Sequence, residues 1–241
     1  MRSENVNARV AAVLFICATA ASLIDRALLS PILDSPDYLA AIAANPGRVT
    51  AGALLQVIAG LMCAGIAVAL YPVLRRRAEA MALGSVGLRF VEGSLYILSA
   101  IGALLLVNLS QLAASGAEAS SGTSGALLLA LRERASVVGI LAFYVGGTLY
   151  YLIFFRSGLI PRWLAGWGVV ATSLGLVASV LVFCGALELF STVQVAMNIP
   201  IFFNELVLAA WLLIKGFNLP IEAVASDCSP TAAPSLSAWT A

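Results

Sequence analysis

The sequence predicts an all-α integral membrane protein built as a bundle of six transmembrane helices. Composition is the first reason, because 61% of the 241 residues are hydrophobic and only 10% are charged, whereas soluble domains carry about 25% charged residues. The mean hydropathy of +1.01 agrees with this. The second reason is arrangement. The hydrophobic residues fall in six long blocks, each able to cross about 30 Å of hydrocarbon as a helix.

These blocks place one six-helix transmembrane domain over residues 1–217. The third block starts weakly, because Arg89 and Glu92 interrupt it. Residues 218–241 are rich in Ser, Ala and Pro, which predicts a disordered tail. The predicted spans run over about 8–29, 51–74, 81–109, 135–155, 163–187 and 199–217.

The first block has some features of a cleavable signal peptide. Ala18-Thr19-Ala20 resembles a small-residue cleavage site, and basic residues precede the block. However, apolar residues continue through Ile24 and resume at Ala27–Leu29. We therefore expect this segment to remain as the first span.

Two loops on the outer side stand out. Ser35 and Pro36 are expected to cap and begin a short helix over Tyr38–Ala44, which Asn45-Pro46-Gly47 then ends. Residues 115–125 are rich in Gly, Ser and Ala, and this composition predicts a flexible loop.

The placement of Lys and Arg predicts the orientation. With the N-terminus inside, eight basic residues lie on the inner side and four on the outer side, which follows the positive-inside rule. This predicts a multi-pass protein of the cell membrane with cytoplasmic N- and C-termini. The inner set is Arg2, Arg9, Arg75, Arg76, Arg77, Arg156, Arg162 and Lys215; the outer set is Arg26, Arg48, Arg132 and Arg134.

Composition also excludes several kinds of site. The chain has no histidine, so Ser-His or Cys-His catalysis and histidine-ligated zinc or haem are excluded. The four cysteines are scattered singly, which is typical of small buried side chains rather than a metal site. Because the net charge is only +1, no nucleic-acid partner is indicated. We predict no cofactor and no metal, and the lipid bilayer is the expected partner; a homo- or hetero-oligomer and a small-molecule ligand are left open.

The most informative residues are charges inside apolar blocks. Arg89, Glu92 and Tyr96 share one helix face, because they are three and four residues apart. Asn204 and Glu205 lie inside the sixth block. A charge at the bilayer centre costs roughly 3 kcal/mol or more, so such residues usually face the protein interior and pair.

Depth predicts that these charges meet. Glu92 and Glu205 each lie about ten residues from the inner end of their spans, roughly 15 Å deep. If the third and sixth spans are neighbours, Arg89, Glu92 and Glu205 form one layer. One arginine and two glutamates leave a surplus carboxylate, which must be neutral or hydrogen-bonded, with Tyr96 and Asn204 as candidate donors.

A second motif lies in the loop between the fourth and fifth spans. In the run from Arg156 to Trp163, Gly158 gives the turn its freedom and Pro161 suits a first helical turn. Topology anchoring is the favoured interpretation, and headgroup capture is the alternative. The motif residues are Arg156, Ser157, Gly158, Pro161, Arg162 and Trp163.

Three segments resemble the DUF4386 family of bacterial multi-pass membrane proteins of unknown function. Arg89-Phe90-Val91-Glu92 resembles its R-x-x-E, and Arg156–Leu164 resembles R-S-G-x-[IL]-P-R-x-L. Glu205 followed by Trp211–Gly216 resembles E…L-W-L-L-x-K-G. The match extends from about Ala8 to Gly216, with Ala165 where a glycine is common. The resemblance implies six spans in a bacterial inner membrane and supplies no reaction.

Three function classes remain open. A non-enzymatic structural, partner-binding or sensory role is slightly favoured. The alternative is a small-solute or proton-coupled transporter that uses Arg89, Glu92 and Glu205. An intramembrane enzyme with the two glutamates as acid and base is least favoured.

Overall fold

The chain folds into seven helices in the computed structural model, which describes residues 2–115 and 121–218; these residues contain no strand. Six helices are long and apolar enough to cross a membrane. The prediction of an all-α membrane bundle with six spans is therefore confirmed. The helices are α1 (Arg2–Leu33), α2 (Tyr38–Ala44), α3 (Pro46–Leu74), α4 (Glu79–Ala114), α5 (Ser121–Ser157), α6 (Arg162–Phe183) and α7 (Thr192–Ile214).

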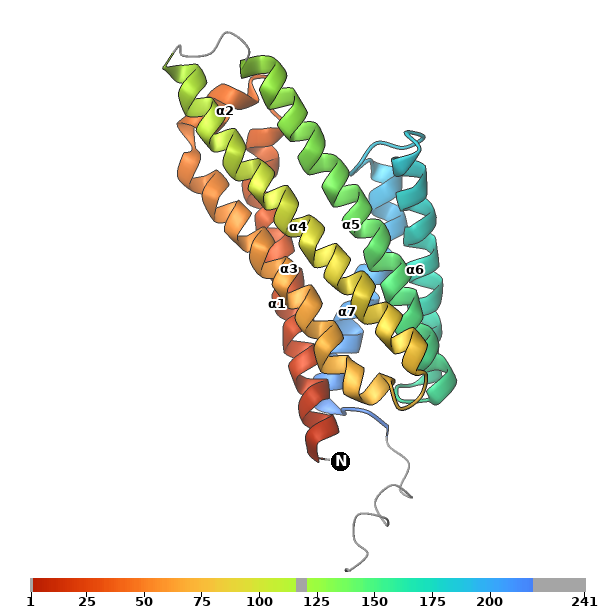
Figure 1. The fold of residues 1–241 in the computed structure, drawn as a ribbon. Coiled ribbons are helices and arrows are strands. Elements are labelled where there is room, and N and C mark those ends of the chain that lie inside the picture. Colours follow the sequence, from red (N-terminus) through yellow and green to blue (C-terminus); the bar gives the residue numbers. More distant parts are fainter. Residues whose placement is uncertain (1, 116–120, 219–241) are drawn as a thin grey trace, which may run out of the picture.

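The six long helices form a closed ring. Each packs against the next in the order α1, α3, α4, α5, α6 and α7, and α7 packs back against α1. Figure 1 shows α4 and α5 on one side of the bundle and α7 behind them. In this ring α4 and α7 lie on opposite sides, so a long side chain from either can reach the interior.

The two ends of the bundle differ in what they carry. The start of α1, the end of α7, the α3–α4 turn and the α5–α6 turn all lie at one end (Figure 1). We call this the N-terminal end. The opposite end carries α2, which packs against α1, α3 and α4.

Several helices extend beyond the spans expected from hydropathy. α5 begins at Ser121 rather than near residue 135, because a helix continues past the apolar stretch that marks a membrane span. α7 begins at Thr192, where the Ser191 hydroxyl accepts a hydrogen bond from Gln194 N at 3.4 Å. α6 ends at Phe183, four residues before the predicted end, and Gly185 follows with a φ of +75°.

The connections at the end opposite the N-terminus differ in detail from the expectations. α2 covers Tyr38–Ala44, but its N-cap is Asp37, so Ser35 and Pro36 precede the helix. Pro46 is the first residue of α3. Of the loop predicted over residues 115–125, positions 116–120 lie outside the described residues and the rest from Ser121 is helical.

Tyr38 of α2 packs against the early part of α5. A Cβ at Gly125 would lie 2.6 Å from the Tyr38 hydroxyl, so α5 packs closely on α2 at this point. Tertiary packing here outweighs the weak helix propensity of the Gly/Ser-rich segment. The tail predicted over residues 218–241 lies, apart from Asn218, outside the described residues.

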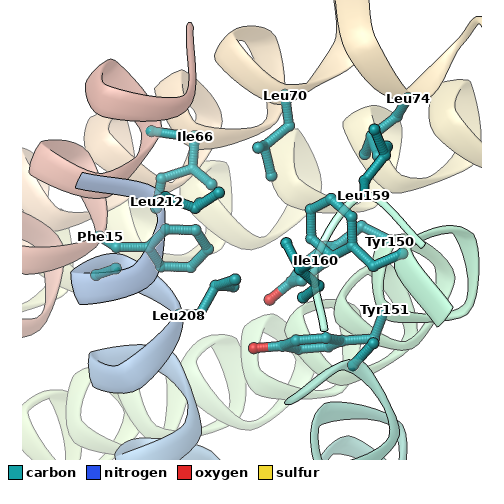
Figure 2. Close-up of a cluster of buried hydrophobic side chains, with 14 of the residues drawn as sticks. Phe15, Ile66, Leu70, Leu74, Tyr150, Tyr151, Leu159, Ile160, Leu208 and Leu212 are labelled. Atoms are coloured by element: carbon teal, nitrogen blue, oxygen red, sulfur yellow. The ribbon is translucent and has the colours of Figure 1, made fainter. Parts of the chain in front are cut away.

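The larger hydrophobic core fills the half of the ring nearest the N-terminal end. In Figure 2, Phe15, Ile66, Leu208 and Leu212 converge with Tyr150 and further side chains on one interior region. The Tyr150 and Tyr151 rings lie 4.5 Å apart between centroids. A smaller core at the other end joins α1, α2, α3 and α4.

α3 and α4 meet backbone to backbone halfway along the bundle. A Cβ at Gly93 would lie 2.5 Å from the Gly60 carbonyl oxygen, and one at Gly60 would lie 2.8 Å from the Gly93 carbonyl oxygen. Small residues allow membrane helices to approach this closely. This contact fixes the part of α4 that carries Arg89 and Glu92.

Candidate functional site

Arg89 lies at the centre of a cluster of polar side chains inside the ring of helices. Its side chain is only 2% exposed, and Nη1 donates hydrogen bonds to Glu92 Oε2 at 3.1 Å and Oε1 at 3.4 Å. Nη2 donates to the Tyr150 hydroxyl on α5 at 3.1 Å. Arg89 is therefore held by its own helix and by the neighbouring one.

Glu205 lies on the far side of the same guanidinium. Its Oε1 is 3.6 Å from Arg89 Nη2, and its side chain is 17% exposed. The same Oε1 accepts no hydrogen bond among the described residues. Arg89 thus makes a full hydrogen-bonded pair with Glu92 and a longer ion pair with Glu205.

Three aromatic rings lie close to the guanidinium. Arg89 Cζ lies 4.7 Å from the ring centroid of Phe143, 5.4 Å from that of Tyr150 and 5.9 Å from that of Phe15. A cation over a ring face is attracted by the quadrupole of that ring, by about 2 kcal/mol or more when desolvated. These faces compensate part of the hydration that Arg89 loses on burial.

A cavity of about 240 Å³ adjoins the three charges. It lies between α1, α3, α4, α5 and α7, and we call it the central cavity. Most of the wall surface is apolar, although more than half of the lining residues are polar and two of them, Glu92 and Glu205, carry carboxylates. The polar lining residues are Thr19, Ser22, Cys63, Arg89, Glu92, Tyr96, Asn198 and Glu205; the apolar ones include Phe15, Ile66, Phe143, Ile201 and Phe202.

The structure brings together most of the polar residues singled out in the sequence. Arg89, Glu92, Tyr96 and Glu205 all line the central cavity. Asn204 does not join them, because its Nδ2 donates to the Leu164 carbonyl of α6 at 3.1 Å. Consecutive helix residues point about 100° apart, so Asn204 faces α6 while Glu205 faces the interior.

The three charged side chains come together, but the arrangement of their helices differs from the one expected. The expectation was that the third and sixth spans, α4 and α7, are neighbours. In the structure they face each other across the ring, with α1 and α3 between them on one side and α5 and α6 on the other. The long Arg89 side chain spans the interior and makes the contact.

Several residues of this site gave no signal in the sequence. Tyr150, Phe143 and Cys63 are ordinary members of apolar blocks. The order of helices around the ring brings Phe143 and Cys63 to the cavity wall and Tyr150 to Arg89. Asn198 lines the cavity and accepts a hydrogen bond from the Tyr144 hydroxyl at 2.7 Å. Among the cysteines, Cys63 is buried as expected, whereas Cys17 and Cys184 are exposed on the bundle surface.

A second cavity of about 520 Å³ lies nearer the end opposite the N-terminus. We call it the distal cavity. Arg26 pairs there with Asp34 at 3.6 Å and lies 3.6 Å from the centre of the Phe190 ring. Asp25 Oδ1 and Arg132 Nε are buried without a hydrogen-bond partner among the described residues.

The two cavities are stacked along α1. Ser22 lines the central cavity, and Asp25 and Arg26, three and four residues further on, line the distal one. Residues at this spacing lie on one helix face, about one turn apart. A series of polar groups therefore extends from the middle of the bundle toward its far end.

The Arg156–Trp163 motif closes the N-terminal end of the bundle. Gly158 has a φ of +70°, and the turn inserts Leu159 and Ile160, each 1% exposed, into the core. Pro161 is the N-cap of α6 and Arg162 its first residue. Arg156 and Trp163 remain exposed at this end, and Ser157 Oγ accepts from Leu159 N at 3.5 Å.

The chemistry available in the central cavity is that of charge and hydrogen bonding. Within the described residues, no three His, Cys, Asp or Glu side chains gather as a metal site would require. If all three groups are ionised, Arg89, Glu92 and Glu205 sum to −1. The cavity therefore suits a group that brings one positive charge and hydrogen-bond donors to Glu205.

Comparisons with known proteins agree with the architecture and give no activity. No curated protein matches the chain, and no solved structure matches it. One family model, described as a domain of unknown function (DUF4386), matches residues 10–216. That range contains the six long helices almost completely, together with both cavities. The chain belongs to the DUF4386 family of multi-pass membrane proteins, whose function is unknown.

Proposed function

We propose that this protein is a non-enzymatic, solute-binding membrane protein whose central cavity takes a small organic cation, with Glu205 as the counter-ion. The observation that carries the proposal is Glu205 Oε1. This atom belongs to a cavity-lining residue and accepts no hydrogen bond within the described chain. An ammonium N–H supplies the hydrogen bond that this oxygen lacks, and a positive charge in addition to that of Arg89.

The charge balance supports the same ligand. Arg89 is shared unequally, because its two hydrogen bonds to Glu92 leave Glu205 with a single contact at 3.6 Å. In low dielectric an uncompensated charge costs several kcal/mol. A bound cation removes the surplus, and a proton on a carboxyl group removes it when the cavity holds no solute.

The size of the central cavity and the chemistry of its wall indicate which kind of cation it can bind. At about 240 Å³, the cavity is below the usual range of roughly 300–1,000 Å³ for small-molecule sites. Phe15, Phe143 and Phe202 contribute aromatic surface, and such surface attracts alkylated ammonium groups. Methylammonium and tetramethylammonium are therefore suitable probes, and Na⁺ is the probe without alkyl surface.

Thermal unfolding of the purified protein in detergent tests this proposal. A cation that binds only the folded state raises the midpoint in proportion to ln(1 + [L]/Kd). We expect an alkylammonium ion to raise it in the wild type and not in Glu205→Gln, which keeps the shape of the side chain. Glu79→Gln is the matched control, because Glu79 is exposed at the start of α4.

Two results would overturn the proposal. One is that neither alkylammonium ion raises the midpoint more than an equal concentration of NaCl. The other is that Glu205→Gln responds as strongly as the wild type and Glu79→Gln.

A specific observation also favours transport as a second candidate function. The distal cavity begins one turn of α1 beyond the central one, so polar groups lead from mid-bundle toward the far end. Pro200 lies within α7 between Asn198 and Glu205. Proline removes a backbone hydrogen bond and permits a helix to bend beside a cavity.

Uptake into proteoliposomes separates transport from binding alone. Radiolabelled methylammonium should accumulate in vesicles that contain the wild type, and Glu205→Gln should abolish this. Asp25→Asn should slow uptake while leaving the thermal response to the cation intact. Binding without uptake in the wild type would leave binding as the function and reject transport.

We further infer that the protein lies in the bacterial cell membrane with its N-terminal end and both termini in the cytoplasm. The basic residues support this, since eight lie toward that end and four toward the other. Reporter fusions test the orientation. Green fluorescent protein fused after residue 241 should fluoresce, and alkaline phosphatase inserted after Ser115 should be active; the opposite pattern would reverse the assignment.

A further inference from the structure

A third cavity lies at the N-terminal end, between the α3–α4 turn and the end of α5. Its volume is about 360 Å³. The turn contributes Arg77 and Ala78, the first turn of α4 contributes Met81, and α5 contributes Ile153, Arg156 and Ser157. Two segments about 80 residues apart in sequence thus each place one arginine at the same cavity.

The three consecutive arginines of the turn have different surroundings. Arg76 Nη1 pairs with Glu4 Oε1 at 2.8 Å. Arg75 Cζ lies 5.8 Å from the centre of the Tyr71 ring. Arg77 lines the cavity and makes no ion pair among the described residues, so its charge is available to a ligand.

Arg156 is available in the same way. It belongs to the last turn of α5, lines the cavity and makes no ion pair within the described part of the chain. The cavity has no acidic lining residue. Two guanidinium groups without a carboxylate between them form a site for an anion, and guanidinium matches phosphate oxygens in paired hydrogen bonds.

The rest of the wall and the position of the cavity point to a lipid. Met81 and Ile153 give the cavity an apolar side. An inorganic anion would make no favourable contact with this side. The cavity lies where one membrane-spanning helix begins and another ends, which is the depth of lipid headgroups. Basic pockets of this kind bind anionic headgroups.

We propose that this cavity binds the phosphate of an anionic membrane lipid between Arg77 and Arg156, with the glycerol and upper acyl chain against Met81 and Ile153. Ser157 offers a hydroxyl to the same headgroup. The site is separate from the central cavity and does not depend on the function proposed for it.

Native mass spectrometry of the detergent-solubilised protein tests this, with phosphatidylglycerol as the probe and phosphatidylcholine as the zwitterionic comparison. We expect the wild type to retain phosphatidylglycerol preferentially. R77Q/R156Q should weaken that retention roughly tenfold or more. R75Q/R76Q is the matched control, since it removes the same charge from the same end and should weaken retention less than about threefold.

A second variant tests the proposal in case R77Q/R156Q fails to fold. M81E adds a carboxylate at the apolar wall and leaves both arginines in place, and it should also reduce retention of phosphatidylglycerol. The proposal would be overturned if M81E retained phosphatidylglycerol as well as the wild type. It would also be overturned if R75Q/R76Q and R77Q/R156Q lost phosphatidylglycerol retention equally. An inorganic phosphate arm distinguishes the source: if millimolar phosphate displaces phosphatidylglycerol completely, the site is for free phosphate and the lipid assignment is wrong.

Discussion

Arg89 and Glu205 approach to 3.6 Å across the interior of the ring, although they belong to helices on opposite sides of it. Glu92, on the same helix as Arg89, takes the two hydrogen bonds of Nη1. The two carboxylates therefore differ in kind. Glu92 is fully paired and fixes the arginine. Glu205 lines a cavity, and its Oε1 lies 3.6 Å from Arg89 but accepts no hydrogen bond within the described chain.

Removing Arg89 should destabilise the fold strongly. Arg89→Gln leaves the buried Glu92 and the partly buried Glu205 without a cation, and breaking a buried ion pair in this way costs about 3–5 kcal/mol. The measurement is the free energy of unfolding in detergent. Arg134→Gln serves as the control, because Arg134 is exposed and makes no ion pair among the described residues; equal stability of the two variants would contradict the central role of Arg89.

The two glutamates should separate stability from binding. Glu92→Gln removes the partner that holds Arg89, so it should lower the free energy of unfolding by about 2 kcal/mol or more. Glu205→Gln loses one longer contact and the surplus charge, so it should change stability by less than about 1 kcal/mol while abolishing the response to alkylammonium ions. The reverse order of stabilities would show that Glu205, not Glu92, is the structural partner.

Gly93 should tolerate no side chain, because it fixes the position of the helix that carries the arginine. Alanine there would place Cβ 2.5 Å from the Gly60 carbonyl oxygen, and overpacking of this kind costs about 1–3 kcal/mol. Gly87→Ala on the same helix is the control, since a Cβ there meets nothing within 4 Å and the better helix propensity of alanine favours it. A Gly93→Ala melting temperature at or above that of Gly87→Ala would disprove the close approach.

Much of this site follows from sequence because the membrane makes charge expensive. Arg89, Glu92 and Glu205 stand out in apolar blocks, and matching their depths predicts that they meet. Helix order around the ring does not follow, because apolar surfaces in lipid do not specify which helix packs on which. For the same reason Tyr150 and Phe143 could not be assigned to the site.

The direction in which a single side chain points does not follow from the sequence either. The sequence places Asn204 in the cluster because it precedes Glu205, yet one helical step turns it toward Leu164 of α6. The predicted helix ends differ from those in the structure where a helix continues beyond its apolar block. Arg132 and Glu133 lie about three turns into α5, just before the apolar block predicted over 135–155, and they do not interrupt the helix.

Binding of the cation should depend on pH through competition with a proton. If a proton balances the surplus carboxylate in the empty cavity, each bound cation displaces it. Affinity should then fall as pH is lowered and level off where the carboxyl is already ionised. Calorimetry in two buffers of different ionisation enthalpy measures the proton released, and an alkylammonium affinity independent of pH from 5 to 8 would reject the competition.

Cys63 offers a direct test that the central cavity takes up solutes from water. It is a buried cavity-lining residue, whereas Cys17 and Cys184 lie on the bundle surface. In a variant with Cys63 as its only cysteine, a small cationic methanethiosulfonate reagent should label the thiol, and tetramethylammonium should slow that labelling several-fold. Adding Glu205→Gln should abolish the protection but leave Cys63 reactive. The matched control keeps Cys184 alone, which is exposed at the end of α6, and its labelling rate should not respond to the cation. Equal protection at both positions would indicate a general effect on the reagent and would remove this support for a ligand in the cavity.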